Sequence, residues 1–456
     1  MNDLVSMSAY SLAKAIRRRD VSSLDVTRAF IDRIEAVNPR LNAVVQTRYE
    51  AAFDEARRKD TDQARGVLHG PLHGVPMTIK DSLETEDLIT TAGTTGLRHH
   101  LPERDATVVA RLKSAGAILL GKTNTPELTL RFVTDNYVYG RTSNPYDLER
   151  SPAGSSGGAA AIVAAGGAAF DIGTDYAGSI RMPAHVCGIA GLKPTGRRVP
   201  RSGHIPFLEM GATEAFISVG PLARKVEDLD LILRIIAGPD TRDPFVVPGP
   251  IDASEAVVLK TLRVALFTDN GVTPASPDTT AVVEAAGVSL MNLGAGVERV
   301  RPPGIDTAPE LWMRLVLADG GHGIRVLLKN LGTQRMHPLL DWSLARAPSS
   351  SEEMAEALVD WNRLRAEGLS FLDRHDVILS PVSATPATLH EAPAAVDYTH
   401  LYSLLGWPVA VVRCGTSREG LPIGVQIAGG PWREDLVLAV ARHLELTFGG
   451  WQAPAI

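Results

Sequence analysis

Residues 151–195 have the sequence "SPAGSSGGAAAIVAAGGAAFDIGTDYAGSIRMPAHVCGIAGLKPT", and this stretch decides the fold. The serines and glycines at its start predict a turn, and the alanine-rich run that follows predicts a helix. Apolar residues near position 170 predict a short buried strand. A second turn, at residues 174–179, leads into another helix that begins near Ser179. Helix, strand and helix in close succession are typical of an α/β protein.

Short apolar runs alternate with helical patterns on both sides of this stretch. Residues 8–60 show helical periodicity with charged faces, and Asn38 followed by Pro39 predicts a turn between two helices. From about residue 66, runs such as "GVPMTIKD", "AILLGKT", "DVILSPV" and "GLPIGVQIAG" predict strands. Residues 239–260, rich in Pro and Asp, predict a long surface connection. We therefore expect an α/β fold with a largely parallel or mixed sheet covered by helices on both faces.

Composition and charge exclude several classes of function. The chain has 456 residues, with 46 Lys and Arg against 52 Asp and Glu and a formal net charge of −6. This balance argues against a nucleic-acid partner, because no basic face is available to neutralise phosphates. The start lacks the pattern of a signal peptide and no apolar run is long enough to span a membrane, so we expect a cytoplasmic protein. The sequence leaves a homodimer open.

The two cysteines and two short motifs offer little support for a metal or nucleotide site. Cys187 and Cys414 have no disulfide or metal-ligand spacing, and we expect no metal and no cofactor. "GAILLGKT", residues 116–123, matches the phosphate-loop pattern, but its middle residues favour a buried strand and no helix follows.

"GSSGG", residues 154–158, matches the nucleophile elbow of α/β-hydrolases, with Ser156 at its centre. The polar, proline-containing residues before it are no buried strand, so an esterase that uses Ser156 is only an alternative.

The turn at residues 174–179 is the stronger candidate for chemistry. It offers consecutive backbone N–H groups at a helix N-terminus, an arrangement that stabilises an oxyanion next to a nucleophilic Ser179. His185 lies about two turns into the predicted helix and points away from that serine. Lys80 ends a short apolar strand, where burial lowers the pKa of its amine toward a neutral, proton-accepting form. Ser179 and Lys80 are therefore the candidate nucleophile and base.

The motifs "GVPMTIKD", "GSSGG" and "GTDYAGSIRMPA" together resemble those of the amidase signature family of serine hydrolases. The similarity continues in "DATVVARLKSAGAILLGKTNTPE" (105–127), "GLKPTGRRVPRSG" (191–203) and "GLPIGVQIAGGPWREDLVL" (420–438). The resemblance implies the amidase signature fold, with a large mixed sheet covered by helices on both faces, in a single domain, residues 1–456. Within it we expect a helical N-terminal part (1–60), core motifs (about 66–240) and a variable substrate-pocket region (about 240–400).

The resemblance also implies a Ser–cis-Ser–Lys triad and an acyl-enzyme intermediate. Ser179 would be the nucleophile, Ser155 a bridging serine preceded by a cis peptide bond, and Lys80 the base. The implied oxyanion hole consists of the backbone N–H groups of Tyr176, Ala177, Gly178 and Ser179. Three further side chains are expected to brace the two turns: Ser156, Asp175 and Arg181.

The implied activity is hydrolysis of acyl–nitrogen bonds in a small-molecule amide, aryl amide or carbamate, with urethanase and esterase side activities. An alternative within the family is the amidase subunit of a tRNA-dependent amidotransferase, which needs a second protein as its partner. Four large side chains either line an acyl pocket or belong to the core: Trp312, Met313, Trp342 and Trp361.

Two residues depart from the family pattern. Ala177 and Ala153 both stand where glycine is usual, and an alanine at position 177 is tolerable if its φ is negative.

Overall fold

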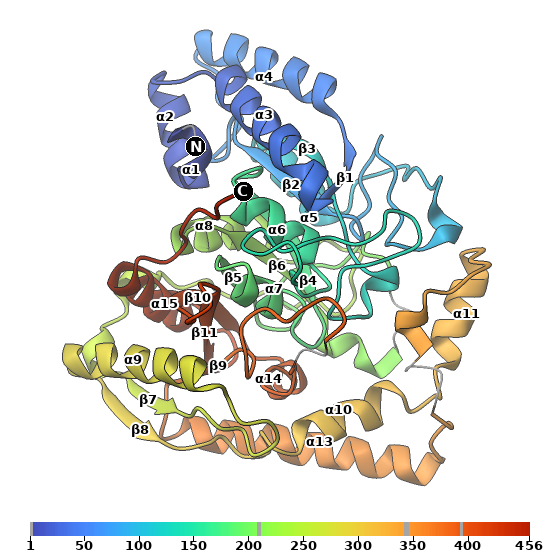
Figure 1. The fold of residues 1–456 in the computed structure, drawn as a ribbon, viewed down its shortest axis with the longest axis vertical. Helices are drawn as coiled ribbons and strands as arrows, with labels where there is room; N and C mark the ends of the chain where they lie inside the picture. The colour runs from blue at the N-terminus through green and yellow to red at the C-terminus, as the bar shows by residue number, and fades with distance from the viewer. Residues whose placement is uncertain (1–2, 208–210, 342–345, 393–394) are drawn as a thin grey trace.

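Eleven strands form one sheet within the described residues. The computed structural model describes residues 3–207, 211–341, 346–392 and 395–456. The strands are β1 (Val44–Thr47), β2 (Pro76–Lys80), β3 (Ile118–Thr123), β4 (Phe170–Asp175), β5 (Ala190–Lys193), β6 (Ser218–Ala223), β7 (Arg263–Leu266), β8 (Gly296–Arg299), β9 (Val377–Pro381), β10 (Val409–Thr416) and β11 (Pro422–Gly429). Their order across the sheet is β1-β3-β2-β4-β6-β5-β10-β11-β9-β7-β8 (Figure 1). β2 is parallel to β3 and β4, and β7 is parallel to β8 and β9, whereas the other neighbours are antiparallel.

Helices cover both faces of this sheet. They are α1 (Asp3–Ser6), α2 (Ala9–Arg18), α3 (Ser23–Leu41), α4 (Tyr49–Ala64), α5 (Thr107–Ser114), α6 (Gly157–Ala164), α7 (Arg181–Val186), α8 (Val226–Ile236), α9 (Pro277–Leu293), α10 (Ala308–Val316), α11 (His322–Asn330), α13 (Ser351–Leu372), α14 (His400–Leu405) and α15 (Glu434–Phe448). In β11, Gly424 faces α7 and Gly429 faces α15. The two glycines are an odd number of residues apart, so these helices lie on opposite faces. The predicted α/β fold is confirmed.

The alanine-rich helix α6 is buried along its whole length. Its small side chains let the helix approach the backbone that follows β3 very closely. A Cβ on Gly158 would lie 2.4 Å from the amide nitrogen of Asn124, so only glycine fits there. This close packing fixes the position of the serine-containing turn that precedes the helix.

The prediction of a turn at Asn38 and Pro39 is wrong by a few residues. α3 continues through Pro39 to Leu41, because proline near the end of a helix removes only one hydrogen bond while the apolar face of the helix stays buried. The turn follows directly: the side-chain oxygen of Asn38 accepts hydrogen bonds from the N–H groups of Ala43 and Val44, both at 2.8 Å.

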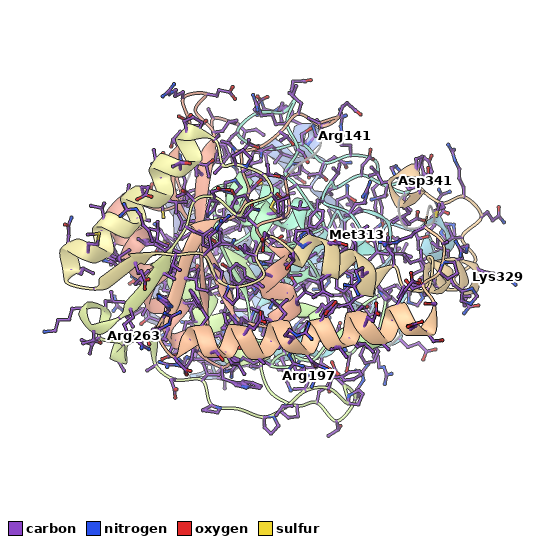
Figure 2. The ribbon with its side chains drawn as sticks, turned by 90° about the horizontal axis from the view of Figure 1, so that it is seen from below. Arg141, Arg197, Arg263, Met313, Lys329 and Asp341 are labelled. Atoms are coloured by element: carbon purple, nitrogen blue, oxygen red, sulfur yellow. The ribbon has the colours of Figure 1, made fainter. Side chains whose placement is uncertain are left out.

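Residues 239–260 form the predicted surface connection. They contain only short 3-10 turns, at Ser254–Ala256 and Leu259–Thr261, and most of their side chains are exposed or half-buried. The connection leads to a second apolar cluster, in which α10, α13 and α14 pack together. In Figure 1, α10 and α13 lie at the end of the molecule opposite α3 and α4. Figure 2 shows α10, which carries Met313, on the inner side of α13.

Candidate active site

Lys80 is fully buried at the end of β2, as predicted. Its Nζ lies 2.7 Å from Ser155 Oγ, 3.1 Å from Ser156 Oγ and 2.8 Å from Thr174 Oγ1. Burial lowers the pKa of Lys80 to about 7, and the negative charges of Asp175 and Asp171 oppose this shift only in part. A lysine with this pKa exists partly as the neutral amine near pH 7, which is the form that accepts a proton.

Two backbone turns, one with Ser155 and one with Ser179, come together next to Lys80. The peptide bond between Gly154 and Ser155 is cis, as the resemblance implies, and Ser155 is buried. The backbone N–H of Ser156 donates to the carbonyl oxygen of Ser179 at 3.2 Å, which joins the first turn to the second. The structure therefore brings Lys80, Ser155 and Ser179 into one site from three separate segments of the chain.

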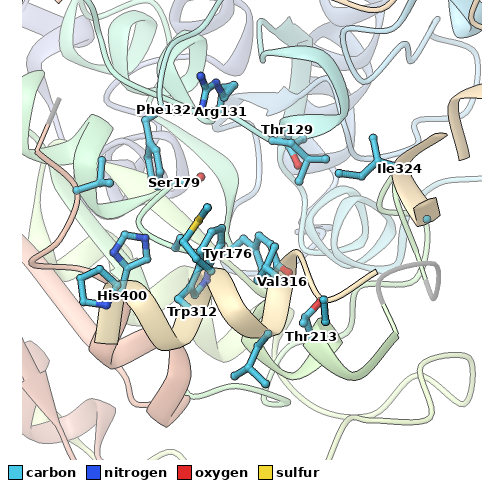
Figure 3. Close-up of a pocket in the computed structure, with 18 of the residues that line it drawn as sticks. Thr129, Arg131, Phe132, Tyr176, Ser179, Thr213, Trp312, Val316, Ile324 and His400 are labelled. Atoms are coloured by element: carbon cyan, nitrogen blue, oxygen red, sulfur yellow. The ribbon is translucent and has the colours of Figure 1, made fainter. Parts of the chain in front are cut away.

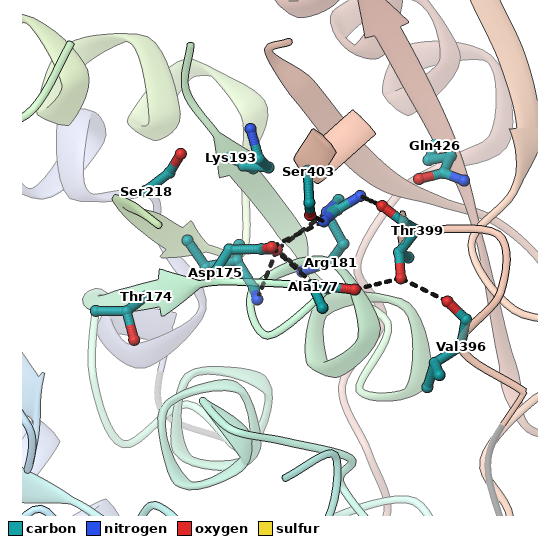
Figure 4. A network of polar contacts seen from close by, with 12 residues as sticks. Thr174, Asp175, Ala177, Arg181, Lys193, Ser218, Val396, Thr399, Ser403 and Gln426 are labelled. Atoms are coloured by element: carbon teal, nitrogen blue, oxygen red, sulfur yellow. Dashed lines mark hydrogen bonds and ion pairs between the residues drawn. The ribbon is translucent and has the colours of Figure 1, made fainter. Parts of the chain in front are cut away.

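A buried ion pair braces the second turn (Figure 4). Asp175 and Arg181, both fully buried, form an ion pair at 2.8 Å. Asp175 also accepts hydrogen bonds from the N–H groups of Gly178 at 2.8 Å and Ile180 at 3.0 Å. Burial alone raises the pKa of Asp175, but the Arg181 guanidinium outweighs it and the pKa falls to about 2. Arg181 in turn donates to Thr399 O at 2.7 Å and to Ser403 at 2.8 Å, which ties the turn to the C-terminal part of the chain.

Four backbone N–H groups of the second turn are expected to form an oxyanion hole, and in the structure one of the four already has an acceptor. Gly178 donates its N–H to Asp175. Tyr176, Ala177 and Ser179 donate theirs to no acceptor within the described residues. Gly178 has φ of +137°, and a Cβ there would lie 2.8 Å from Thr399 Oγ1, so the turn requires glycine at this position.

The two alanines that depart from the family pattern differ in backbone conformation. Ala177 does not have a positive φ, so its methyl group causes no strain, and its carbonyl oxygen accepts a hydrogen bond from the Thr399 hydroxyl. Ala153 has φ of +59°, in the left-handed region that favours glycine. Glycine, which the resemblance implies at position 153, would adopt this conformation without strain.

Arg181→Met is expected to destabilise the protein by about 3–5 kcal/mol, because it leaves the buried Asp175 carboxylate without its partner. The free energy of unfolding in urea measures this. Arg57→Met is the matched control, since the Arg57–Asp54 pair is more than half exposed and such pairs contribute little. Equal stabilities of the two variants would show that the Asp175–Arg181 pair does not hold the turn.

Ser179 lies at the wall of a cavity of about 600 Å³ (Figure 3), within the usual range for ligand pockets. The side chains that line it are mainly apolar, and they include Leu130, Phe132, Tyr176, Trp312, Met313, Leu315, Val316, Ile324, Leu327 and Leu339. Many of them come from α10, α11 and the segment after α11. Trp312 and Met313 therefore face the cavity. Trp361 instead packs edge-to-face on Phe216 and donates to Leu404 O, and Trp342 lies outside the described residues.

Three alternatives from the sequence do not fit this geometry. Both ring nitrogens of His185 are in use, since Nδ1 accepts from Gly424 N at 2.8 Å and Nε2 lies 3.1 Å from Thr385 O. Residues 118–123 form strand β3, so the phosphate-loop match is a buried strand. Ser156, the serine of the elbow match, is fully buried, and its hydroxyl is bonded to Lys80 and to the backbone of Thr174.

Three polar residues that contact the site were not predicted. The Thr174 side chain contacts the lysine, whereas the sequence predicts a role only for the backbone of that turn. The alternation of β4 does not predict this contact, because Asp171 contacts Thr78 of β2 and the two-residue period of a strand then places Thr174 on the opposite face. Thr399 and Ser403, which hold Arg181, gave no local signal at all, since they are more than 200 residues away in the sequence.

Within residues 3–207, 211–341, 346–392 and 395–456, no three His, Cys, Asp or Glu side chains are grouped so that they could hold a metal ion. The helices of these same ranges include none with the length and apolar character needed to cross a membrane.

Comparison with known proteins shows the family of this chain. The model of the Amidase family matches residues 25–438. The chain is 34% identical to human fatty-acid amide hydrolase 2, over 99% of this chain and 91% of that protein. It is 35% identical to a glutamyl-tRNA(Gln) amidotransferase subunit from Moorella thermoacetica, over 97% of each. The solved structure of a fatty acid amide hydrolase superimposes with a TM-score of 0.90 at 26% identity, over 98% of this chain and 86% of that one. The chain therefore belongs to the amidase signature family, whose members hydrolyse amide bonds.

Proposed function

We propose that this enzyme hydrolyses amides with a large apolar acyl or aryl group through a triad of Ser179, Ser155 and Lys80. One observation carries the proposal. The buried amine of Lys80 lies 2.7 Å from Ser155 Oγ, directly behind a turn whose Ser179 lines a mainly apolar cavity of about 600 Å³.

In the proposed mechanism the neutral amine of Lys80 takes the proton of Ser155 Oγ, which takes the proton of Ser179 Oγ. Ser179 Oγ forms a bond to the substrate carbonyl carbon, and the N–H groups of Tyr176, Ala177 and Ser179 stabilise the oxyanion. The carbon–nitrogen bond then breaks as Ser155 returns the proton to the leaving nitrogen. Water hydrolyses the acyl-enzyme through the same proton relay.

The cavity favours an apolar acyl group over glutamine. Its lining comes largely from apolar side chains of α10 and α11, and burying a hydrocarbon chain against them is favourable. The relatives named for fatty-acid amides support the same substrate class. Carbamates and esters present the same carbonyl carbon to Ser179, so the proposal includes them as secondary substrates.

A series of acyl anilides, from acetyl to dodecanoyl, tests the substrate class. We expect kcat/KM to rise by up to about 4-fold for each added CH2 until the cavity is full, since each buried CH2 contributes about 0.8 kcal/mol. Glutamine, an aryl carbamate and an aryl ester complete the panel. Release of ammonia from glutamine as the fastest reaction would support the amidotransferase alternative instead.

One pair of variants, assayed with the same acyl anilides, tests whether the acyl group binds in the cavity. Val316→Trp, on the cavity wall, should reduce turnover of the long acyl chains and leave the acetyl substrate little changed. Val359→Trp, at a position 55% exposed on α13, is the control. Equal activity of Val316→Trp and wild type on the long chains would place the acyl group elsewhere.

A further inference from the structure

Lys80 can act as a base only if its lone pair points toward Ser155. A neutral amine has two N–H donors and one lone pair, and three hydroxyls surround Nζ. Two of these hydroxyls must therefore accept from the amine, and their own protons must go to other acceptors. Otherwise one of them donates to the lone pair and competes with Ser155.

The Ser156 hydroxyl has such an acceptor. Ser156 Oγ lies 3.3 Å from the carbonyl oxygen of Thr174, to which it donates its proton. It also accepts a hydrogen bond from the Thr174 N–H at 3.3 Å. Ser156 is thus able to receive one N–H of Lys80 and is prevented from donating to the amine.

Thr174 also lines a second, small cavity, together with Ser155. The volume of this cavity is about 10 Å³, which is about the room that one water molecule needs. Ser155, Thr174 and His204 are the buried polar side chains on its wall, which also includes Pro206 and Ile217.

His204 offers a hydrogen-bond acceptor to this cavity. Its side chain is only 3% exposed, and Nδ1 lies 2.8 Å from the carbonyl oxygen of Pro206, so Nδ1 carries the proton and Nε2 is an acceptor. Nε2 is buried and has no hydrogen-bond partner within the described residues. Burial lowers the pKa of His204 to about 3, which keeps the ring neutral.

The backbone around His204 is fixed to the segment that follows Lys80. The N–H of Ile205 donates to Ser82 O at 2.8 Å, and the N–H of Glu84 donates to Gly203 O at 2.7 Å. The ring is thereby held at a constant position relative to the lysine.

We propose that His204 Nε2 accepts the hydroxyl proton of Thr174 through one water molecule in the small cavity, and so directs the Lys80 lone pair toward Ser155. His204 is then a positioning residue. The inference rests on the proposed function, in which Lys80 is the base. Removal of the Nε2 acceptor turns the Thr174 hydroxyl toward Lys80, where it occupies the lone pair.

Three substitutions of His204 test this in the full-length protein, with kcat for an acyl anilide as the readout. His204→Leu is expected to lower kcat about 10- to 100-fold, the cost of a buried group without its partner. His204→Gln, whose side-chain oxygen can replace Nε2, should stay within about 3-fold of wild type. His204→Asn reaches only the position of Nδ1 and should lose as much activity as His204→Leu.

A double-mutant cycle with Thr174→Val separates positioning from packing. Thr174→Val lowers activity by itself, but it leaves no hydroxyl proton for His204 to accept. His204→Leu should therefore cost less than about 3-fold further in that background. Losses that multiply, or a Gln variant no better than Leu, would overturn the proposal. If Ser179→Ala or a Lys80 variant kept full activity, the proposed function itself would be wrong.

Discussion

Ser179→Ala is expected to abolish amide hydrolysis, with a loss of about 10⁴-fold or more in kcat/KM for the best acyl anilide, because the covalent step has no other nucleophile. The fold should not change. The Ser179 side chain lines the cavity, and the contact that joins the two turns is made by its backbone carbonyl, which the substitution keeps. Thermal unfolding within a few degrees of wild type would check this.

Two measurements distinguish Ser179 from the neighbouring serines. Ser156→Ala removes a hydroxyl that contacts Lys80 and should lose much less activity than Ser179→Ala. A slowly hydrolysed aryl carbamate should leave its carbamoyl group on the peptide that contains Ser179, as detected by mass spectrometry. An active Ser179→Ala enzyme, or a label on Ser156, would reassign the nucleophile.

The elements that carry the site were predictable because their signals are local. β2 (PMTIK) and β4 (FDIGTD) each contain apolar residues that predict a short buried strand, and they end at Lys80 and Asp175. The alanine tract predicts α6, because only small side chains let a helix pack directly against neighbouring backbone. The Gly154–Ser155 cis bond and the pairing of Lys80 with Ser155 came from the family resemblance rather than from any of these patterns.

Contacts between distant segments were not predictable from such patterns. Arg181 was expected to brace the turn, but its contacts with Thr399 and Ser403 depend on how the start of α14 lies against α7, which begins at Arg181. His204 gave no signal in the sequence, because its position beside the triad follows from pairing of residues 203–205 with residues 82–84. The predicted end of α3 was wrong for a different reason. Pro39 predicts a turn, but burial of the apolar face of the helix keeps the chain helical to Leu41.

Lys80→Met is expected to lower kcat/KM roughly 1000-fold, the contribution typical of a general base. In the wild type the same lysine should set the acid limb of the pH profile. Below its pKa of about 7 the amine is protonated and cannot accept the proton of Ser155, so kcat/KM should fall tenfold per pH unit and level off above that pKa. A pH-independent kcat/KM through this range would contradict the assignment of Lys80 as the base.

Lys80→Met is also expected to change how the free energy of unfolding depends on pH. A lysine in an unfolded chain has a pKa of about 10.4, whereas burial lowers that of folded Lys80 to about 7. Between these values the unfolded chain binds more protons than the folded protein, so Lys80 makes the wild type more stable as the pH rises. Methionine does not titrate, so the variant lacks this contribution to the pH dependence of stability. Burial also lowers the pKa of Lys193 to about 7, but Lys193 is present in both proteins, so its contribution cancels in the difference between them.

The free energy of unfolding of Lys80→Met minus that of wild type is therefore expected to fall by up to about 1.4 kcal/mol per unit between about pH 8 and 10. The range begins above the pKa of Asp171, which burial raises to about 7, so that this neighbouring carboxyl is ionised throughout. Urea denaturation at several pH values measures the difference. Lys260→Met, at an exposed lysine, is the matched control and should give a constant difference. A constant difference for Lys80→Met as well would mean that the folded protein holds this lysine charged, and the proton relay would then lack its base.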